Sequence, residues 1–589
     1  MARRKQANVA RTASSRSLAA IFNETSPELL APASDEKPTT IEPSAPVEDE
    51  ESAEPVKFPL SLIYDFQDLL NNHLTVSKGV QVMVCLYLCQ IFYIHLHKET
   101  GMEVISAVGF NILSAIVAMY LSHRSLVKKH EASPETAPYP QLPAFNSLYA
   151  FFIPYSFVLL LADPKDPFFQ VNLSLTNFSL QNLHPIAKVL SAFVYNYMFS
   201  DANTLDIVQF GQVVWIYFMV EFALKAWNEE TVEEKDGSYS VRRTMDPTEI
   251  HIVAIFMVNL LANFKVPLSD TTVPIYIVRI LSLALIGAFA LATPIYYAYL
   301  QLQSGALRAF VALLVVSVFS TTFYYLTNYL FLLFVVEKEV LTWLFEFIAA
   351  TELRQKLLTY WMLALGGILP AIFFAASKDI ISINNRRKVW HFALVGALAY
   401  PALTQEPTYS AIAVLGSVFI FIALECLRCT RITFMGDVIN SLLHFFQDDK
   451  DLKGPLSLLY IFLLVGVAIP IGYGVVVDDV VSMRSYLGLI ALGLGDSLAS
   501  IIGKRFGKTK WKGESRSVEG TVAYIVVTFA SFVLADYYVL PEGARVKNWE
   551  NMFIVSLVGG AIEGSASLND NVLIPSVTLI TYELLNKVF

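Results

Sequence analysis

Charged residues are scarce in this chain. Asp, Glu, Lys and Arg make up 16% of its 589 residues, whereas 55% of the residues are hydrophobic. A soluble domain usually carries about a quarter charged residues. Apolar runs of about 20 residues, the length that a helix needs to cross a hydrocarbon core, recur along almost the whole sequence. The composition therefore excludes an ordinary soluble protein and predicts an all-α polytopic membrane protein.

Cysteine is also rare, with four residues in all. Cys85 and Cys89 lie on one face of the first predicted span, where core packing explains them. Cys426 and Cys429 form a CxxC pair, but no second pair accompanies it, so it is a weak signal for zinc or redox chemistry. The chain has neither a Walker A loop nor a Rossmann glycine fingerprint. Its first segment also lacks the apolar core of a signal peptide.

Residues 1–57 begin with a basic, Ser- and Arg-rich stretch and continue as an acidic, Pro-rich stretch. Such a composition cannot bury a core, so we expect a disordered cytosolic tail. We expect residues 58–384 to form an N-terminal transmembrane region and residues 385–589 to form a second transmembrane domain that carries the chemistry.

The apolar runs predict about 15 transmembrane helices. The segment 183–200 carries His184, Pro185 and Lys188, and is expected either to cross or to lie along the interface. The predicted spans lie near residues 79–97, 104–122, 145–162, 207–226, 249–266, 275–297, 308–335, 357–376, 389–404, 408–427, 455–477, 484–502, 519–539, 551–567 and 572–588.

The orientation follows from Lys and Arg in short loops, which favour the cytosol. With the tail inside, loops such as 428–454 and 503–518 come out cytosolic. The loop 163–206 then lies on the far side, where its two sequons, at Asn172 and Asn177, are open to glycosylation. Every chemically interesting segment therefore shares the cytosolic face.

The densest polar signal is the segment 495–520, between two predicted spans. Six Lys or Arg residues and one acid lie between residues 503 and 516, and glycine recurs at 495, 503, 507, 513 and 520. Glycines let a backbone approach phosphate closely, and lysines supply point charges. A plain basic loop is the alternative. However, Asp496 and Ser497 lie within an apolar stretch, where an ionisable group is usually functional. We therefore predict a nucleotide or phosphate site.

Other polar groups face the same compartment. Arg387, Lys388 and His391 stand at the entry of a predicted span, where His391 is either a base or phosphate donor or part of a basic anchor. Glu425 and Arg428 form an i,i+3 pair that is better read as structural. Glu563 and Asp570 flank a polar turn, and carboxylates near phosphate commonly hold Mg²⁺. An acidic turn carries Asp448, Asp449 and Asp451.

These ordered motifs resemble the CTP-dependent lipid kinases, which include dolichol kinases, fungal diacylglycerol kinase and plant phytol kinase. The resemblance covers roughly residues 385–589. Its elements are the loop 495–520, the entry at Arg387–Phe392, Glu425 with Arg428, the acidic turn before Gly454 and Pro455, and the closing Asp570, Asn571 and Pro575. The long multi-spanning N-terminal half is similar to dolichol kinases. Two departures stand out: Arg516 replaces the usual Lys before Ser517, and one extra residue precedes Gly454.

The resemblance implies a multi-pass enzyme of the endoplasmic reticulum membrane whose active site faces the cytosol. It implies transfer of the γ-phosphate of CTP to dolichol, which supports N-glycosylation and GPI-anchor synthesis. Asp496 and His391 are the catalytic candidates. Asp496, Glu563 and Asp570 are candidate ligands of Mg²⁺ or another divalent cation. The nucleotide-binding candidates are Gly495, Ser497, Gly503, Lys504, Gly507, Lys508, Lys510, Arg516, Ser517, Glu519, Gly520, Arg387 and Lys388.

Two other classes compete with this interpretation. A phosphatidate-type cytidylyltransferase shares a similar loop, but the characteristic Pro-Gly-His-Gly-Gly stretch does not follow Glu519 here. A transporter would suit many spans, but the chain has no internal repeat and its polar groups gather at one face rather than at the midplane. We expect no nucleic-acid partner, and a homo-oligomer remains open.

Overall fold

The structure is a computed structural model. It describes residues 76–99, 185–198, 205–233, 239–245, 247–262, 268–303, 305–378, 380–447, 454–478, 481–511, 515–546, 548–565 and 569–588, with the single positions 106, 109, 113 and 132. Outside the described residues lie the predicted tail, most of the predicted span 104–122, the predicted span 145–162, both sequons and the acidic turn.

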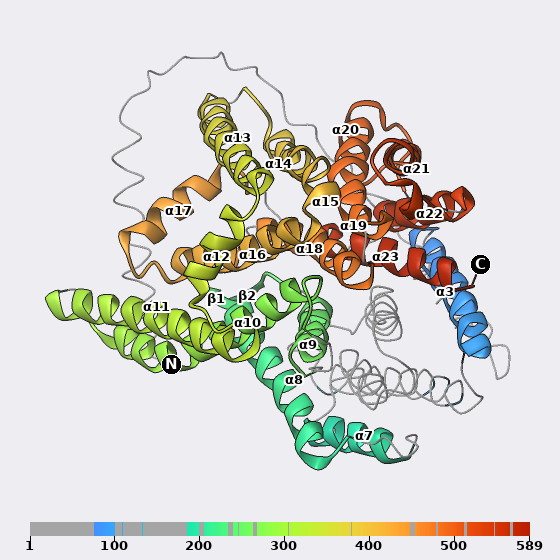
Figure 1. The fold of residues 1–589 in the computed structure, drawn as a ribbon. Coiled ribbons are helices and arrows are strands. Elements are labelled where there is room, and N and C mark those ends of the chain that lie inside the picture. The colour runs from blue at the N-terminus through green and yellow to red at the C-terminus, as the bar shows by residue number, and fades with distance from the viewer. Residues whose placement is uncertain are drawn as a thin grey trace, which may run out of the picture. The chain divides into compact units, whose positions relative to one another are not determined.

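The described part of the chain is helical except for one β-hairpin (Figure 1). In chain order the elements are α3 (Val76–Glu99), α7 (Pro185–Met198), α8 (Ile207–Asn228), β1 (Glu229–Glu233), β2 (Tyr239–Arg243), α9 (Pro247–Ala262), α10 (Val273–Gln301), α11 (Ala306–Phe334), α12 (Val340–Ala349), α13 (Glu352–Ser377), α14 (Ile383–Leu398), α15 (Ala402–Gln405), α16 (Pro407–Thr430), α17 (Phe434–His444), α18 (Leu459–Val477), α19 (Met483–Gly488), η2 (Leu489–Asp496), α20 (Ser497–Phe506), α21 (Val518–Tyr538), η3 (Glu542–Ala544), α22 (Trp549–Ser565) and α23 (Asp570–Val588).

Eight helices in the described residues are long and apolar enough to cross a membrane. They include α8, α13, α16 and α21, and the continuous run from Met483 to Phe506. This confirms the predicted all-α membrane class, although it does not reach the predicted count of about 15 spans. The predicted spans 249–266 and 551–567 correspond to α9 and α22. These helices have 16 and 17 residues, fewer than the 18 residues that a candidate span requires here.

The segment 183–200 contains α7, a helix of 14 residues. At 1.5 Å per residue it extends about 21 Å, less than the hydrocarbon core of about 30 Å. Its length therefore fits the interfacial alternative better than a crossing.

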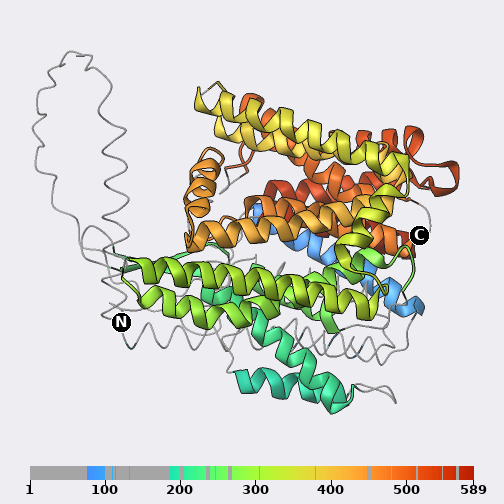
Figure 2. The same cartoon turned by 60° about the vertical axis from the view of Figure 1, so that its left-hand side comes forward.

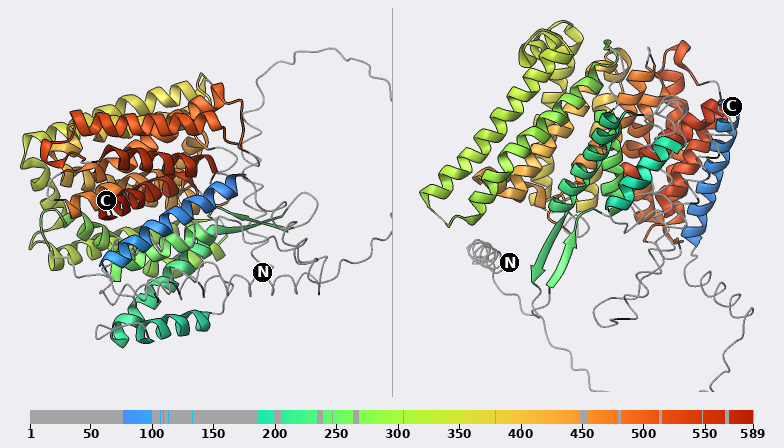
Figure 3. Two further views of the ribbon diagram at one scale, coloured as in Figure 1. Left: turned by 90° about the vertical axis from the view of Figure 1, so that its right-hand side faces the viewer. Right: turned by 90° about the horizontal axis from the view of Figure 1, so that it is seen from below.

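The β-hairpin is the exception to the all-α prediction. β1 and β2 pair antiparallel and place Glu229 opposite Arg243 and Glu230 opposite Arg242. The Arg243 Nε lies 2.9 Å from the Glu229 carboxylate. Opposite charges in directly facing positions favour this register. Figure 3 shows the two strands projecting away from the ends of the helices that they join.

Contacts divide the chain into two compact units. In the unit that contains Ala292–Ser317, the Arg308 guanidinium lies 4.7 Å from the centre of the Tyr299 ring. The other comprises Asn71–Leu291 and Val318–Phe589. Every predicted site residue belongs to this second unit.

One large hydrophobic cluster forms the core of the second unit. It takes buried side chains from α3, α16, α18, α19, η2, α21, α22 and α23, among them Leu88, Ile471, Leu487 and Ile580. Cys85 and Cys89 pack against this cluster, as expected from the sequence. Helices that follow one another in the chain pack together in pairs: α20 with α21, α21 with α22, and α22 with α23. In Figure 2 the yellow and orange helices, which include α13 and α16, run in broadly the same direction.

The run from Met483 to Phe506 changes its winding in the middle. α19 leads into the π-helix η2, which ends at Asp496, and α20 follows directly. π-Helical turns are rare and occur frequently at functional sites. A Cβ on Gly495 would lie 2.8 Å from the Tyr524 ring on α21, so only glycine fits this contact without a shift. The π-helix η2 thus ends at Asp496, where the polar residues of the segment 495–520 begin.

Candidate active site

Asp496 is buried at the end of η2 and forms an ion pair with Lys388 of α14. The side chains of Asp496 and Lys388 are 7% and 12% exposed. The two residues are 108 positions apart in the chain, and the packing of α14 against η2 brings them together. A buried carboxylate needs such a partner, because an unpaired charge in an apolar interior is costly.

His391 stands one helical turn after Lys388 and is also buried. Its Nδ1 lies 2.9 Å from the Leu492 carbonyl oxygen and 3.6 Å from the Asp496 carboxylate. A carbonyl can only accept, so Nδ1 carries the proton in this hydrogen bond. In the neutral ring Nε2 then holds the lone pair, which is the form that a general base requires.

The loop after α20 is folded back on itself. The Glu519 carboxylate accepts hydrogen bonds from the backbone N–H groups of Lys508 and Thr509, at 3.1 and 3.0 Å. Lys510 and Ser517 form an isolated antiparallel bridge. Glu519, predicted to bind nucleotide, therefore shapes the loop, while the side chains of Lys508 and Lys510 and that of Lys504 are exposed at its surface. Three exposed lysine side chains within seven positions can together bind a polyanion.

The glycines of this segment serve helix packing. A Cβ on Gly503 would lie 2.8 Å from the Ser517 hydroxyl oxygen, and one on Gly520 would lie 2.9 Å from the Ala499 carbonyl oxygen. Gly507 N–H donates to the Gly503 carbonyl, and Gly520 N–H donates to the Ser517 hydroxyl. These two amides are thus already hydrogen-bonded within the protein, so direct phosphate binding by the glycine backbone stays a prediction.

Arg516 links the loop to the α22–α23 region. One guanidinium nitrogen donates to the Glu563 carbonyl oxygen, and another lies 3.2 Å from the Asp570 carboxylate. The Glu563 carboxylate accepts from the Thr521 hydroxyl at 3.3 Å. Arg516 also interacts electrostatically with the carboxylates of Asp496 and Glu563. Arg516 therefore contacts the Glu563 backbone and the Asp570 carboxylate directly, while the Asp496 carboxylate is paired with Lys388.

The predicted role of Asp496, Glu563 and Asp570 as ligands of a divalent cation stays a prediction. No group of three or more His, Cys, Asp or Glu side chains suited to a metal lies in the described residues. Mg²⁺ does not need such a cage, because it is usually bound by one or two carboxylates together with substrate phosphates. Asp496, Glu563 and Asp570 supply oxygen ligands of this kind, and Lys388 and Arg516 balance part of their charge.

Other polar residues of the second unit serve the fold. Arg386 donates to three carbonyl oxygens, those of Ala376, Ile381 and Phe445, and thereby ties α13, α14 and α17 together. Arg428 donates two hydrogen bonds to Glu425, at 2.7 and 2.6 Å, which is the expected structural pair. The Cys429 thiol donates to the same carboxylate.

Sequence reasoning missed two side chains from the N-terminal region. Gln81 of α3 donates to the Ser565 carbonyl, and Glu249 of α9 accepts from the Asn569 N–H at 3.0 Å. Neither residue belongs to a motif. The only signal in the sequence that could have found them is that each is a polar residue at the start of an apolar run or inside one.

Comparison with known proteins points to one group. Residues 33–234 match the family described as the dolichol kinase N-terminal domain. The chain is 36% identical over 248 residues to a dolichol kinase of Saccharomyces cerevisiae, a match that covers 42% of this chain and 45% of the relative. It is 28% identical over 262 residues to the dolichol kinase of Homo sapiens, covering 42% and 48%.

A shorter match reaches a phytol kinase of Arabidopsis thaliana, 30% identical over 108 residues, covering 16% of this chain and 36% of the relative. The matched regions span about half the length of the dolichol kinases. No solved structure matches. The resemblance to the dolichol kinase family that the motifs predict is thereby confirmed.

Proposed function

We propose that this protein transfers the γ-phosphate of CTP to dolichol, giving dolichyl phosphate and CDP. The observation that carries the proposal is the pair of ion pairs, Lys388–Asp496 and Arg516–Asp570, in which Arg516 extends from the exposed lysine loop and also donates to the Glu563 carbonyl. Phosphoryl transfer is catalysed mainly by positioning and by neutralising charge, and this arrangement offers both. The names of the similar proteins support dolichol as the acceptor. The donor CTP rests on the resemblance of the loop.

In this mechanism the side chains of Lys504, Lys508 and Lys510 hold the triphosphate at the cytosolic surface. Arg516 reaches from the loop toward the same phosphates, since a guanidinium can grip two phosphate oxygens at once. Mg²⁺ or another divalent cation, held by Asp496 with Glu563 or Asp570, would neutralise the charge on the transferring phosphoryl group. The isoprenoid tail stays among the apolar spans of the membrane.

The dolichol hydroxyl must lose a proton as it attacks the γ-phosphorus. We assign that proton to His391 Nε2, because Nδ1–H is committed to the Leu492 carbonyl. The ion pair with Lys388 holds the Asp496 carboxylate beside the imidazole. Dolichyl phosphate made in this way would serve glycosylation and GPI-anchor synthesis at the endoplasmic reticulum, with the loop on the cytosolic side.

The test is an assay of purified protein with γ-labelled CTP, Mg²⁺ and dolichol. Label in the lipid is the expected result, whereas label in pyrophosphate would indicate a cytidylyltransferase and overturn the proposal. Asp496→Asn and Lys508→Ala should abolish transfer while the protein still inserts. His391→Gln should lower kcat by about 10²–10⁴-fold, as for loss of a general base. Full activity in all three variants would refute the site.

A further inference from the structure

The two carboxylates Glu563 and Asp570 stand at either side of the connection between α22 and α23. The last described residue before this connection is Ser565 and the first after it is Asn569. The distance between the Glu563 and Asp570 carboxylates therefore depends on the contacts that hold Ser565 and Asn569. The helix ends of a connection carry backbone groups without intrahelical partners, which side chains from elsewhere can bind.

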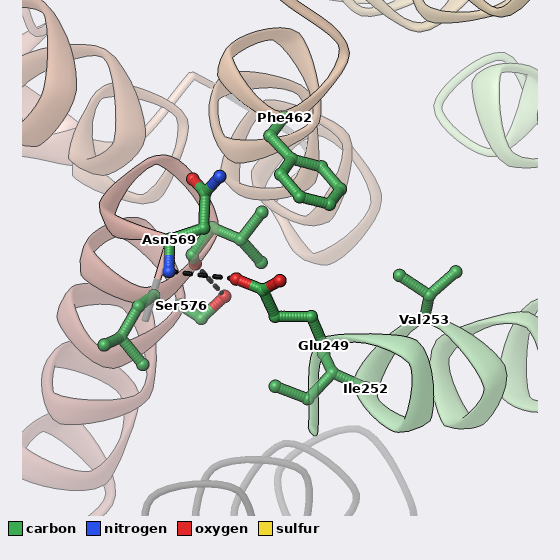
Figure 4. A pocket seen from close by; sticks show the side chains of 8 residues that line it. Glu249, Ile252, Val253, Phe462, Asn569 and Ser576 are labelled. Carbon is green, nitrogen blue, oxygen red and sulfur yellow. Dashed lines mark hydrogen bonds between the residues drawn. The ribbon is translucent and has the colours of Figure 1, made fainter. Parts of the chain in front are cut away.

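Both ends are held by side chains from the N-terminal region. Gln81 is 4% exposed within α3, which packs against α22 and α23, and its side-chain N–H donates to the Ser565 carbonyl. Glu249, in the first turn of α9, accepts from the Asn569 N–H. Figure 4 shows the Glu249 carboxylate reaching from α9 to the start of α23.

The Glu249 carboxylate is partly buried among apolar side chains. The small cavity beside it, about 30 Å³ in volume, is lined mainly by apolar side chains such as Ile252, Val253 and Phe462. A charge-assisted hydrogen bond is stronger where water is kept away. The residue that Glu249 holds, Asn569, immediately precedes Asp570, and its side-chain oxygen accepts from the Asn571 N–H at 3.1 Å.

Arg516 contacts the same region through the Glu563 carbonyl and the Asp570 carboxylate. If Arg516 turns to the triphosphate, as the proposed function requires, its hold on Asp570 is weakened. Contacts that do not involve the nucleotide loop must then hold the Glu563 and Asp570 carboxylates in position. Gln81 and Glu249 provide such contacts from α3 and α9.

We propose that Gln81 and Glu249 are positioning residues that hold the end of α22 at Ser565 and the start of α23 at Asn569, so that Glu563 and Asp570 face the transferring phosphate. This inference rests on the proposed function and deepens it, because it gives the N-terminal region a direct role in the site. Neither residue touches substrate in this proposal.

The decisive experiment measures hydrogen–deuterium exchange of the full-length protein in nanodiscs, without nucleotide or metal. Glu249→Ala should speed exchange of the peptide that contains residues 569–573 by about tenfold, because the Asn569 amide loses its acceptor. Glu249→Gln keeps an acceptor oxygen and should remain close to wild type. Val253→Ala alters the same cavity without touching the connection, so it is the matched control.

The kinetic arm uses the γ-labelled CTP assay. Glu249→Ala and Gln81→Leu should lower kcat by about tenfold or more, since a displacement of about 1 Å can cost two orders of magnitude. Glu249→Gln should restore most of the rate, because its amide oxygen can still accept from the Asn569 N–H, whereas Glu249→Met, which fills similar space without an acceptor, should not. Unchanged exchange and kcat in Glu249→Ala, or equal effects in Val253→Ala, would overturn the inference.

Two results keep this inference separate from the proposed function. Wild-type protein that fails to phosphorylate dolichol would refute the function, while the exchange measurement would still decide whether Glu249 holds the connection. If Glu249→Ala does not fold, Glu249→Asp provides the second variant, because its shorter side chain should not reach Asn569. It should then raise exchange at residues 569–573, and wild-type exchange there would contradict the proposal.

Discussion

Lys388 is the residue on which the charge balance of the site depends. Its ammonium group is the direct partner of the Asp496 carboxylate, and both side chains are nearly buried. Arg387, its neighbour in sequence, lies on a different part of the helix surface, so it cannot take over this pairing. The single pair thus fixes both the position of Asp496 and the approach of α14 to η2.

Replacing Lys388 by Met should destabilise the protein by about 3 kcal/mol or more, because a buried carboxylate is left without its cation. The thermal unfolding midpoint in detergent measures this. Lys356→Ala is the matched control, since Lys356 and its partner Glu352 are 68% and 80% exposed. Its midpoint should not change. Equal midpoints for Lys388→Met and wild type would show that the Lys388–Asp496 pair does not stabilise the fold.

The helix pair α20 and α21 is the element that presents the loop. The two helices approach closely where Gly503 and Gly520 face each other, and Ser517 caps the start of α21 through the Gly520 N–H. Small residues at a crossing allow backbones of membrane helices to pack closely. The glycine spacing in the loop, which looks like a phosphate cradle in sequence, is therefore explained largely by this crossing.

Gly520→Ala should cost about 1–3 kcal/mol, the usual penalty for overpacking, because its Cβ would meet the Ala499 carbonyl oxygen at 2.9 Å. Gly416→Ala, within α16, is the control: no atom lies within 4 Å of its Cβ position. Thermal unfolding of both variants in the same detergent provides the comparison. A Gly520→Ala protein as stable as Gly416→Ala would show that the crossing is looser than described.

At the scale of the whole molecule, the described N-terminal helices α3, α8 and α9 belong to the same compact unit as the helices that carry the site. α3 contributes Leu88 and Ile91 to the main core and packs against α22 and α23. The predicted division at residue 385 stays a prediction, but the candidate site depends on elements from both sides of it.

Truncation should separate the tail from this core. Removing residues 1–32, which precede the matched family region, should leave CTP-dependent transfer within about twofold of wild type, since a polar tail of that composition buries nothing. Removing residues 1–99 deletes α3 and should abolish activity and monodisperse behaviour in detergent. The readouts are size-exclusion chromatography and the γ-labelled CTP assay. An active, monodisperse protein without residues 1–99 would contradict the role given to α3.

The sequence by itself determined the membrane class, most of the described helices and the polar residues of the candidate site. Apolar run length is a local property, and so α13, α16, α18 and α21 begin and end within a few residues of their predicted bounds. The motif residues Lys388, His391, Asp496, Arg516 and Asp570 could also be chosen without a structure, because ionisable groups at the ends of apolar spans are costly and conspicuous.

Only the tertiary structure decided which of these residues meet. Lys388 and Asp496 are 108 positions apart, and Glu249 lies 320 positions before Asn569. Such pairings arise from helix packing, which side-chain volume and glycine contacts control and which no local pattern encodes. For the same reason, the packing role of Gly503 and Gly520, the loop-shaping role of Glu519 and the contacts of Gln81 and Glu249 emerged only when the helices were placed together.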